Sequence, residues 1–170
     1  MEIERISVKK TCCFTGHRPQ KLPWKFNEND ERCIRIKQRA EEEIEKAIIE
    51  GYTIFISGMA LGFDMMCAEI VLKLSERYSN IKLLCFIPCS DQCKKWKFSQ
   101  KERYNKILNK AHVYQISNSK YRNGCMQERN RKMVEFSSKI IALFDGTSGG
   151  TEYTIKYAKE NGLDIVIIKP

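Results

Sequence analysis

Residues 52–74 read YTIFISGMALGFDMMCAEIVLKL and contain, in order, an apolar run, a glycine-rich turn and an amphipathic segment. The largely apolar run Tyr52–Ile56 is typical of a strand that is buried on both faces of a sheet. The positions that follow repeat at helical spacing and form one apolar stripe: Phe63, Met66, Cys67, Ile70, Val71 and Leu74. A buried strand joined by a turn to an amphipathic helix is the repeating unit of an α/β fold.

The same unit recurs along the chain. We expect six strands, at Thr11–Phe14, Tyr52–Ile56, Ile81–Ile87, His112–Ile116, Lys139–Phe144 and Asp164–Ile168. Helical patterns fill the gaps, at about residues 30–50, 63–74, 91–110, 125–137 and 151–161. This alternation predicts a single doubly wound α/β domain with a mostly parallel sheet of about six strands.

The length of 170 residues and the 42% hydrophobic content fit one packed domain. We expect it to cover residues 11–170, after a charged N-terminal arm at residues 1–10. The longest uninterrupted apolar runs, such as Ile140–Phe144, have five residues, whereas a membrane-spanning helix needs about 18. Residues 1–10 also lack the apolar core of a secretory signal. We therefore expect no membrane partner and a cytoplasmic location.

The eight cysteines are expected to be reduced thiols, because the chain is neither short nor preceded by an export signal. No two of them form a C-x-x-C pair. The two histidines, His17 and His112, stand in different segments. No metal site is predicted from this pattern.

The formal net charge of +9 comes from one segment. Residues 94–132 contain twelve Lys or Arg but only two acids, Glu102 and Glu128. The aromatic residues of this segment are Trp96, Phe98, Tyr104, Tyr114 and Tyr121. Such a stretch suits a nucleic acid or a phosphorylated small molecule. The alternative is a solvated helix face with the aromatic rings buried beneath it.

Glycine-rich turns follow three of the predicted strands, at residues 15–19, 57–64 and 145–152. Ligands of parallel sheets bind outside the carboxyl ends of the strands, where helix N-termini present free N–H groups. We therefore expect a nucleotide there, with phosphate and ribose held by Gly16, His17, Arg18, Ser57, Gly58, Ala60, Gly62, Asp64, Gly149, Gly150 and Thr151. The alternative is that the glycines only allow tight turns. No turn matches the dinucleotide fingerprint or the P-loop, so hydride transfer and ATP hydrolysis are not supported.

The helix predicted at residues 125–137 carries a further candidate group, in which Asn130 is also expected to contact the ligand. Asn130 lies close to its apolar stripe, where a polar side chain needs a partner, and Arg129 is adjacent. If the helix begins at the carboxyl edge of the sheet, Arg129 and Asn130 face the last glycine-rich turn and bring a cation beside Glu152. Such a pair would keep Glu152 ionised, as suits a base or a stabiliser of a sugar cation. The alternative is a structural salt bridge.

Together these residues resemble the SLOG superfamily of Rossmann-like proteins and, within it, the YpsA-like family. The matching stretches are Phe14–Pro19, Ser57–Asp64 with Ala68–Glu69, Gln92–Trp96, Arg129–Asn130, and Asp145–Thr151 with Tyr157–Ala158. The resemblance implies a Rossmann-like fold and a nucleotide or nucleotide-derived ligand, similar to NAD or ADP-ribose. It implies no required cofactor besides that ligand. The leading hypothesis is a sensor or sequestering protein without turnover.

A second hypothesis comes from the related LOG phosphoribohydrolases, which cleave the N-glycosidic bond of nucleoside 5'-monophosphates. Met126–Arg129 is similar to the start of their Met-x-x-Arg-Lys helix. Their Pro-Gly-Gly-x-Gly-Thr-x-x-Glu turn is altered here, since Asp145 and Thr147 replace a proline and a glycine and Glu152 follows its threonine directly. That shift by two positions rotates the residue by about 200° on a helix. Arg129 and Glu152 are catalytic only under this hypothesis.

A third hypothesis comes from the DprA-type relatives, which bind single-stranded DNA. The basic segment at residues 94–132 supports it, although the same residues would surround a phosphate ligand. The LOG-like relatives also imply a homodimer, by analogy alone.

Overall fold

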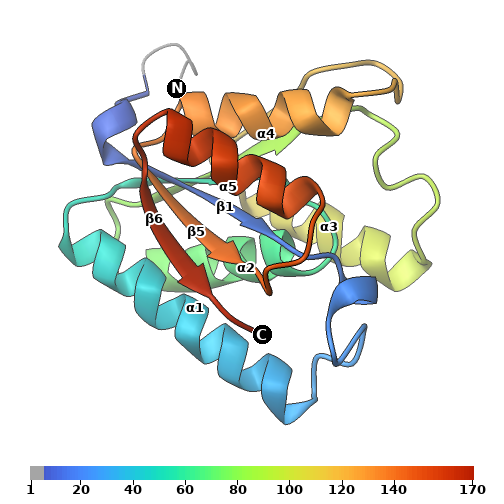
Figure 1. Cartoon of the computed structure of the whole chain (residues 1–170), viewed down its shortest axis with the longest axis horizontal. Coiled ribbons are helices and arrows are strands. Elements are labelled where there is room, and N and C mark those ends of the chain that lie inside the picture. Colours follow the sequence, from blue (N-terminus) through green and yellow to red (C-terminus); the bar gives the residue numbers. More distant parts are fainter. Residues whose placement is uncertain (1–5) are drawn as a thin grey trace.

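Six strands form one parallel sheet in the order β4-β3-β2-β1-β5-β6 (Figure 1). The structure is a computed structural model that describes residues 6–170. The strands are β1 (Thr11–Gly16), β2 (Ile54–Ser57), β3 (Lys82–Ile87), β4 (Val113–Ile116), β5 (Lys139–Leu143) and β6 (Asp164–Ile168). Every neighbouring pair is parallel. The predicted α/β class is confirmed, and the sheet is parallel throughout.

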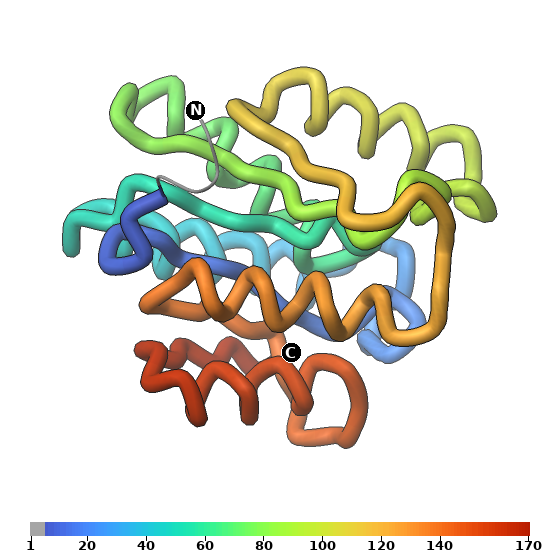
Figure 2. Tube along the Cα trace, turned by 90° about the horizontal axis from the view of Figure 1, so that it is seen from above, coloured from blue at the N-terminus to red at the C-terminus, as the bar shows by residue number. Residues whose placement is uncertain are grey.

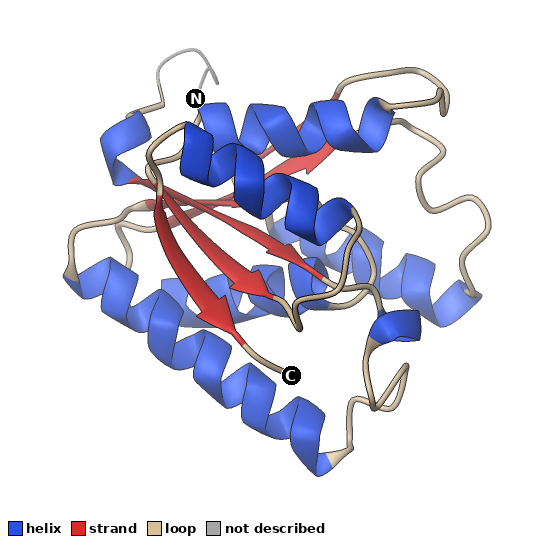
Figure 3. Ribbon diagram, viewed as in Figure 1, coloured by secondary structure: helices blue, strands red, loops and turns tan. Residues whose placement is uncertain are grey.

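Helices cover both faces of this sheet (Figure 3). They are α1 (Glu31–Ile49), α2 (Phe63–Ser75), α3 (Phe98–Lys110), α4 (Cys125–Glu135) and α5 (Gly150–Glu160). The first three contribute to one hydrophobic cluster and the last two to another. Cys12 and Cys13 of β1 belong to different clusters, because successive strand residues point to opposite faces. Burial on both faces explains why the strands are largely apolar.

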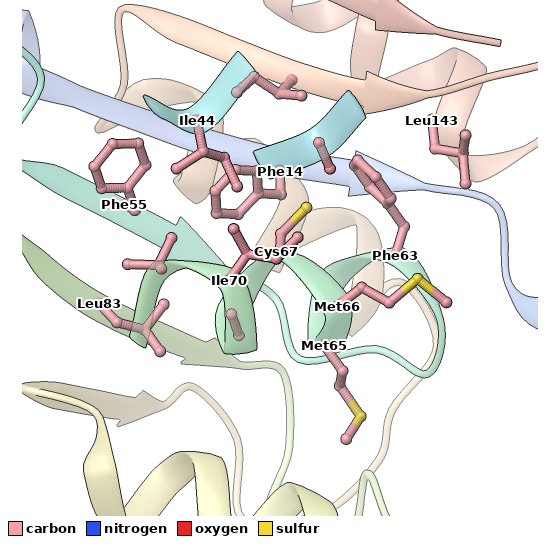
Figure 4. Packing of buried hydrophobic residues seen from close by; sticks show 14 of the residues in the cluster. Phe14, Ile44, Phe55, Phe63, Met65, Met66, Cys67, Ile70, Leu83 and Leu143 are labelled. Carbon is pink, nitrogen blue, oxygen red and sulfur yellow. The ribbon is translucent and has the colours of Figure 1, made fainter. Parts of the chain in front are cut away.

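The predicted stripe of α2 packs against the sheet (Figure 4). Phe63, Cys67 and Ile70 lie under β1 and β2, where the rings of Phe14 and Phe55 stack with their centroids 6.1 Å apart. Nine of the thirteen residues of α2 are buried. Because α2 is packed against the sheet, it fixes the position of the preceding turn, residues 57–62, at the carboxyl end of β2.

Two boundaries differ from the sequence prediction. The helix expected from about residue 91 begins only at Phe98, and residues 91–96 form turns. The reason is a cap: the Gln100 side chain accepts a hydrogen bond of 2.9 Å from the amide of Lys97, which starts the helix there. Of the charged arm expected at residues 1–10, residues 1–5 lie outside the described part, Ile6 is buried and Val8–Lys10 is a short 3-10 helix.

The basic segment is divided between interior and surface. Trp96 packs edge-on against the buried Tyr104, with ring centroids 5.4 Å apart. Phe98, Tyr114 and Tyr121 are exposed instead. The packing of Trp96 and Tyr104 fits the alternative of a solvated helix face, and binding of an anion by this segment stays a prediction.

All eight cysteines are unpaired thiols, as expected. Within residues 6–170, no His, Cys, Asp or Glu cluster of three or more is arranged to hold a metal ion. None of the described helices is both long enough and apolar enough to cross a membrane.

Candidate functional site

The switch point of the sheet lies between β1 and β5. The chain builds β2, β3 and β4 on one side of β1 and then returns to build β5 and β6 on the other. At the carboxyl end of this strand pair, the His17 amide donates to the Leu143 carbonyl oxygen at 3.2 Å. The segments that follow β1 and β5 therefore diverge only after this hydrogen bond. Connections that diverge at a switch point leave a crevice between them, and this is where open α/β sheets bind ligands.

A cleft of about 500 Å3 opens at this place. Figure 2 shows the segment after β1 and the β4–α4 connection at the same end of the molecule. The predicted site residues that line the cleft are Gly16, His17, Arg18, Ala60, Asp64, Arg129, Asn130, Gly150 and Thr151. The volume is within the range of small-molecule sites. The structure thus gathers residues from turns that are far apart in the sequence.

One side of the cleft is cationic. Arg18 is exposed, lines the cleft and forms no ion pair with any residue of the described part. Lys21 lines the cleft as well, and its Nζ donates to the Ser148 carbonyl oxygen at 3.1 Å. Gly150 and Thr151 begin α5 there, so the free N–H groups of its first turn and the positive end of its dipole are at the same place. This side can bind an anion.

His17 and Asp145 connect the ends of β1 and β5. His17 is buried, and its Nε2 is 2.6 Å from Asp145 Oδ1 and 3.4 Å from the Asp145 amide nitrogen. The shorter contact is a hydrogen bond in which Nε2 donates to the carboxylate, which can only accept. Hydrogen bonds from the hydroxyl and the amide of Thr147, assisted by His17, lower the pKa of Asp145 to about 2. His17 thus joins the two turns through a carboxylate, and its expected phosphate contact stays a prediction.

The cleft is lined on its inner side by Arg129 and Asn130, which belong to a buried network of hydrogen bonds. Arg129 Nη1 donates to the Gly58 carbonyl oxygen, and its Nε donates to Asn130 Oδ1 at 2.7 Å. Asn130 Nδ2 donates to Thr154 Oγ1 at 2.9 Å, which ties α4 to α5. Burial lowers the pKa of Arg129, but a guanidinium keeps its proton at neutral pH. Arg129 and Thr154 are thus the hydrogen-bond partners that Asn130 was expected to need beside the apolar stripe of α4.

Asp64 is the acidic group of the cleft. Its Oδ2 accepts from the Ala60 amide at 3.3 Å, and the side chain is buried near the start of α2. Burial raises its pKa above the ordinary value, although the charge of Arg129, the Ala60 hydrogen bond and the charge of Arg18 act in the opposite direction. Asp64 therefore offers an acceptor inside a cleft that is otherwise cationic.

Four predicted ligand residues do not line the cleft: Ser57, Gly58, Gly62 and Gly149. The Ser57 hydroxyl donates to the Asp64 carbonyl oxygen at 2.9 Å and accepts from the Met59 amide at 3.1 Å. A Cβ on Gly58 would be 2.4 Å from Arg129 Nη1, so this glycine admits the guanidinium and not a ligand. Gly62 precedes α2 with a φ of 96°, a conformation that favours glycine. Ser57, Gly58 and Gly62 therefore shape the β2–α2 turn, because their polar groups are used inside it. Gly149 instead precedes α5, where its carbonyl oxygen accepts from the Tyr153 amide at 3.0 Å.

The predicted pair of Arg129 and Glu152 is not formed. Arg129 points to the β2–α2 turn, whereas Glu152 pairs with Lys156 one turn later on α5, with Nζ and Oε1 2.8 Å apart. Glu152 is also absent from the residues that line the cleft. The prediction was wrong because Glu152 lies one position beyond Thr151 on α5, and a step of about 100° moves the side chain away from the cleft.

Other lining residues were not predicted to contact a ligand: Thr15, Gln20, Lys21, Tyr121, Asn123, Gly124, Met126 and Gln127. Gln20 and Lys21 directly follow the predicted residues 16–18, so extending that motif would have included them. Tyr121, Asn123 and Gly124 belong to the β4–α4 connection. No glycine-rich motif marks this connection, and Tyr121 was singled out only as one of the aromatic residues of the basic segment at residues 94–132.

Comparison with known proteins gives a consistent result. The family model described as the YspA SLOG family matches residues 12–169. The SPbeta prophage-derived protein YoqJ of Bacillus subtilis strain 168 is 32% identical over 143 residues, which cover 76% of this chain and 84% of that protein. A UPF0398 protein of Bacillus anthracis strain A0248 is 30% identical over 158 residues, covering 90% and 84%.

Among solved structures, the fold is similar to that of DNA processing protein A from Helicobacter pylori, a structure described for its single-stranded DNA binding mode. The TM-score is 0.61 at 13% sequence identity, and the match covers 94% of this chain. It covers 65% of the other chain, so this protein spans just under two thirds of that structure. At this identity the similarity shows a shared fold.

Proposed function

We propose that this chain, which belongs to the YspA SLOG family, binds a nucleotide or nucleotide derivative through its phosphate groups in the cleft between β1 and β5. It would act as a sensor or sequestering protein. The family membership predicted from the sequence motifs is confirmed. What we propose beyond it is that the chain binds a nucleotide. The support for this binding is the chemistry of the cationic side of the cleft.

The observation that carries the proposal is the state of Arg18. The chain pairs many of its arginines with carboxylates, as it does for Arg32, Arg77 and Arg103. Arg18 has no such partner in residues 6–170, although it stands beside Lys21 and the start of α5. An unpaired guanidinium next to free helix N–H groups is a site for a phosphate, which accepts two parallel hydrogen bonds from arginine.

The inner part of the cleft suits a sugar. Asp64 and Thr15 line it and supply a carboxylate and a hydroxyl within a largely buried surface. A carboxylate that accepts from ribose hydroxyl groups is a common arrangement in nucleotide sites of doubly wound sheets. Phosphate at Arg18 and ribose at Asp64 would place a nucleotide along the cleft.

The test is a binding panel of nucleoside monophosphates, NAD, ADP-ribose and cyclic ADP-ribose by thermal shift and calorimetry. A ligand at 100 times its dissociation constant adds about 2.7 kcal/mol to the free energy of unfolding. This corresponds to an increase of about 5–10 °C in Tm for a domain of this size. Arg18→Gln should weaken the bound ligand about tenfold or more, because it removes a charge-assisted hydrogen bond.

The matched control is Arg35→Gln, which removes the same charge from α1, where Arg35 Nη1 is 3.8 Å from Glu31 Oε2. This variant should bind as the parent does. If no member of the panel binds, the proposed function is wrong. If Arg18→Gln and Arg35→Gln bind equally well, the ligand site is not this cleft.

Chromatography of the same samples tests for turnover. We expect intact ligand, since Arg129 and Glu152 point to different parts of the molecule. Free base released from a monophosphate would instead support the N-glycosidase hypothesis. The expected homodimer stays a prediction, and light scattering on the same preparation measures it.

Single-stranded DNA is the second candidate ligand. It is supported by the basic segment at residues 94–132 with its exposed Phe98, and by the fold that this chain shares with a single-stranded DNA-binding protein. Binding of a fluorescent oligothymidylate should then weaken steeply with salt, because several counterions are released from the backbone. The affinity for a mononucleotide should depend only weakly on salt concentration, because few counterions are released. No binding of the oligonucleotide at low salt would exclude this candidate.

A further inference from the structure

We infer that the cleft has a second, chemically different end, where the ring of Tyr121 forms a stacking platform for a planar base. The ligand class is then a nucleotide with an intact base, and not a sugar phosphate or a bare phosphate. This inference rests on the proposed function, because it extends the phosphate site into the same cleft. It assigns a specificity-determining role to a connection that sequence motifs did not mark.

The β4–α4 connection holds Tyr121 in place by its backbone. The Tyr121 amide donates to Asp91 Oδ1 at 2.7 Å. The Ser90 amide donates to the Asn118 carbonyl oxygen at 3.0 Å, and Asn118 Nδ2 donates to the Pro88 carbonyl oxygen at 2.8 Å. The connection is thus fastened to the segment after β3, yet Tyr121 is 61% exposed and lines the cleft.

Other exposed aromatic residues, such as Phe98 and Tyr114, do not line the cleft, whereas the ring of Tyr121 is exposed within it. Aromatic side chains gain free energy by burial, and here the anchored backbone keeps the ring in water instead. Stacking of a base on such a ring would bury both apolar faces. Because every base has such a face, this interaction favours bases as a class over sugars.

The two ends of the cleft come from different parts of the sheet. The connection with Tyr121 is bound to the segment after β3. On the other side, the hydrogen bond from Lys21 to Ser148 and the pair of His17 with Asp145 lie beyond β1 and β5. Strand β2 separates β3 from β1, so a ligand with phosphate at one end and a base at the other can span the cleft.

Two amide side chains stand beside the aromatic end. Asn123 and Gln127 line the cleft, and neither side chain makes a hydrogen bond or ion pair within residues 6–170. Gly124 lies between them, and its left-handed conformation starts α4 so that Gln127 falls in the first turn. An amide presents a donor and an acceptor together, which is the pattern that matches the edge of a base. The aromatic end therefore offers both a stacking face and groups that distinguish bases.

The test compares ligands with and without a base on matched variants. Calorimetry measures the affinity of AMP, GMP, CMP, UMP and ribose 5-phosphate for the parent, Tyr121→Ala, Tyr121→Phe and Tyr114→Ala. Tyr121→Ala should weaken the monophosphate that the parent binds best by about tenfold, and ribose 5-phosphate by less than about twofold. Tyr121→Phe should bind as the parent does, because it keeps the ring. Tyr114→Ala is the control, since Tyr114 is 55% exposed on β4 but does not line the cleft.

The outcomes separate this inference from the proposed function. If the parent binds ribose 5-phosphate as tightly as every monophosphate, or if Tyr121→Ala weakens both equally, the base platform is wrong and the phosphate site stands. If the parent binds none of these compounds nor any member of the larger panel, the proposed function is wrong and this inference is lost with it. A Tyr121→Phe variant as weak as Tyr121→Ala would also overturn stacking, since it would assign the effect to the hydroxyl group.

Discussion

The turns after β2 and β5 have similar sequences, and the structure uses them in opposite ways. Both are glycine-containing connections that lead into a helix at the same edge of the sheet. In the β2–α2 turn, the Ser57 hydroxyl, the Gly58 carbonyl and the Ala60 amide are all bonded to groups of the protein. In the β5–α5 turn, Gly150 and Thr151 line an open cleft. Only polar groups that the fold leaves without partners are available to a ligand, so the two turns differ in what they can offer.

The strongest test of the closed turn is its buried cation. Arg129→Met leaves the Gly58 carbonyl oxygen and the Asp64 carboxylate buried without the guanidinium, and we expect a loss of about 3 kcal/mol in the free energy of unfolding, measured by urea denaturation. The loss should be smaller in an Asp64→Asn background, because the uncompensated carboxylate is then absent. Equal losses in both backgrounds would show that Arg129 acts by packing and not by charge.

Alanine at one glycine of each turn compares them directly. Gly58→Ala places a Cβ 2.4 Å from Arg129 Nη1 and should cost about 2 kcal/mol in the free energy of unfolding. Gly150→Ala meets nothing within 4 Å and starts a helix, so stability should change by less than about 0.5 kcal/mol. Its added methyl group should instead weaken ligand binding. The comparison fails if Gly150→Ala destabilises the protein as much as Gly58→Ala does.

The junction of β1 and β5 should depend on pH. Thr147 and His17 lower the pKa of Asp145 to about 2, so the stabilisation from this carboxylate is present above its ordinary pKa of about 4 and is lost as the pH falls toward about 2. Asp145→Asn should lower Tm at neutral pH, and the difference from the parent should shrink over this acidic range. Thermal unfolding across the range measures it. A difference that does not change with pH would contradict an ionic contribution.

The smallest effect on stability and binding is expected at Glu152, which is catalytic only under the N-glycosidase hypothesis. Glu152→Gln removes only the surface pair with Lys156, worth about 0.5 kcal/mol or less in the free energy of unfolding. It should leave ligand affinity unchanged, because the side chain lies outside the cleft. Lys156→Gln is the matched control and should have the same small effect. A large loss of binding in Glu152→Gln alone would bring Glu152 back into the site.

Much of the fold could be predicted because it depends on local patterns. All six strands and the apolar stripe of α2 are found where periodicity indicates them. The start of α3 was wrong by several residues, since the cap at Gln100 decides it and the apolar spacing does not. Boundaries set by one side-chain hydrogen bond are not visible in hydrophobic periodicity.

The cleft lies at the edge of the sheet where the sequence predicts a ligand site, but not all of the expected residues line it. Gly16, Arg18, Gly150 and Thr151 line the cleft as expected, because the carboxyl ends of parallel strands meet at one edge. Ser57 and Gly58 were expected in the cleft and instead complete a closed turn. Tyr121 was noticed only as an aromatic residue in a basic segment. The motifs alone do not distinguish the residues that line the cleft from those whose polar groups are used inside a turn.

The sequence by itself determined the fold class, the family and the edge of the sheet that carries the cleft, since these follow from the order of strands, helices and glycine-rich turns. Only the tertiary structure decided which polar groups remain free. The Arg129 guanidinium reaches the β2–α2 turn from another helix, and the position of Glu152 on α5 directs its side chain away from the cleft, toward Lys156. The physical reason is that a hydrogen-bonding group is available to a ligand only when no other part of the folded chain has bound it. That depends on contacts between segments that are distant in the sequence.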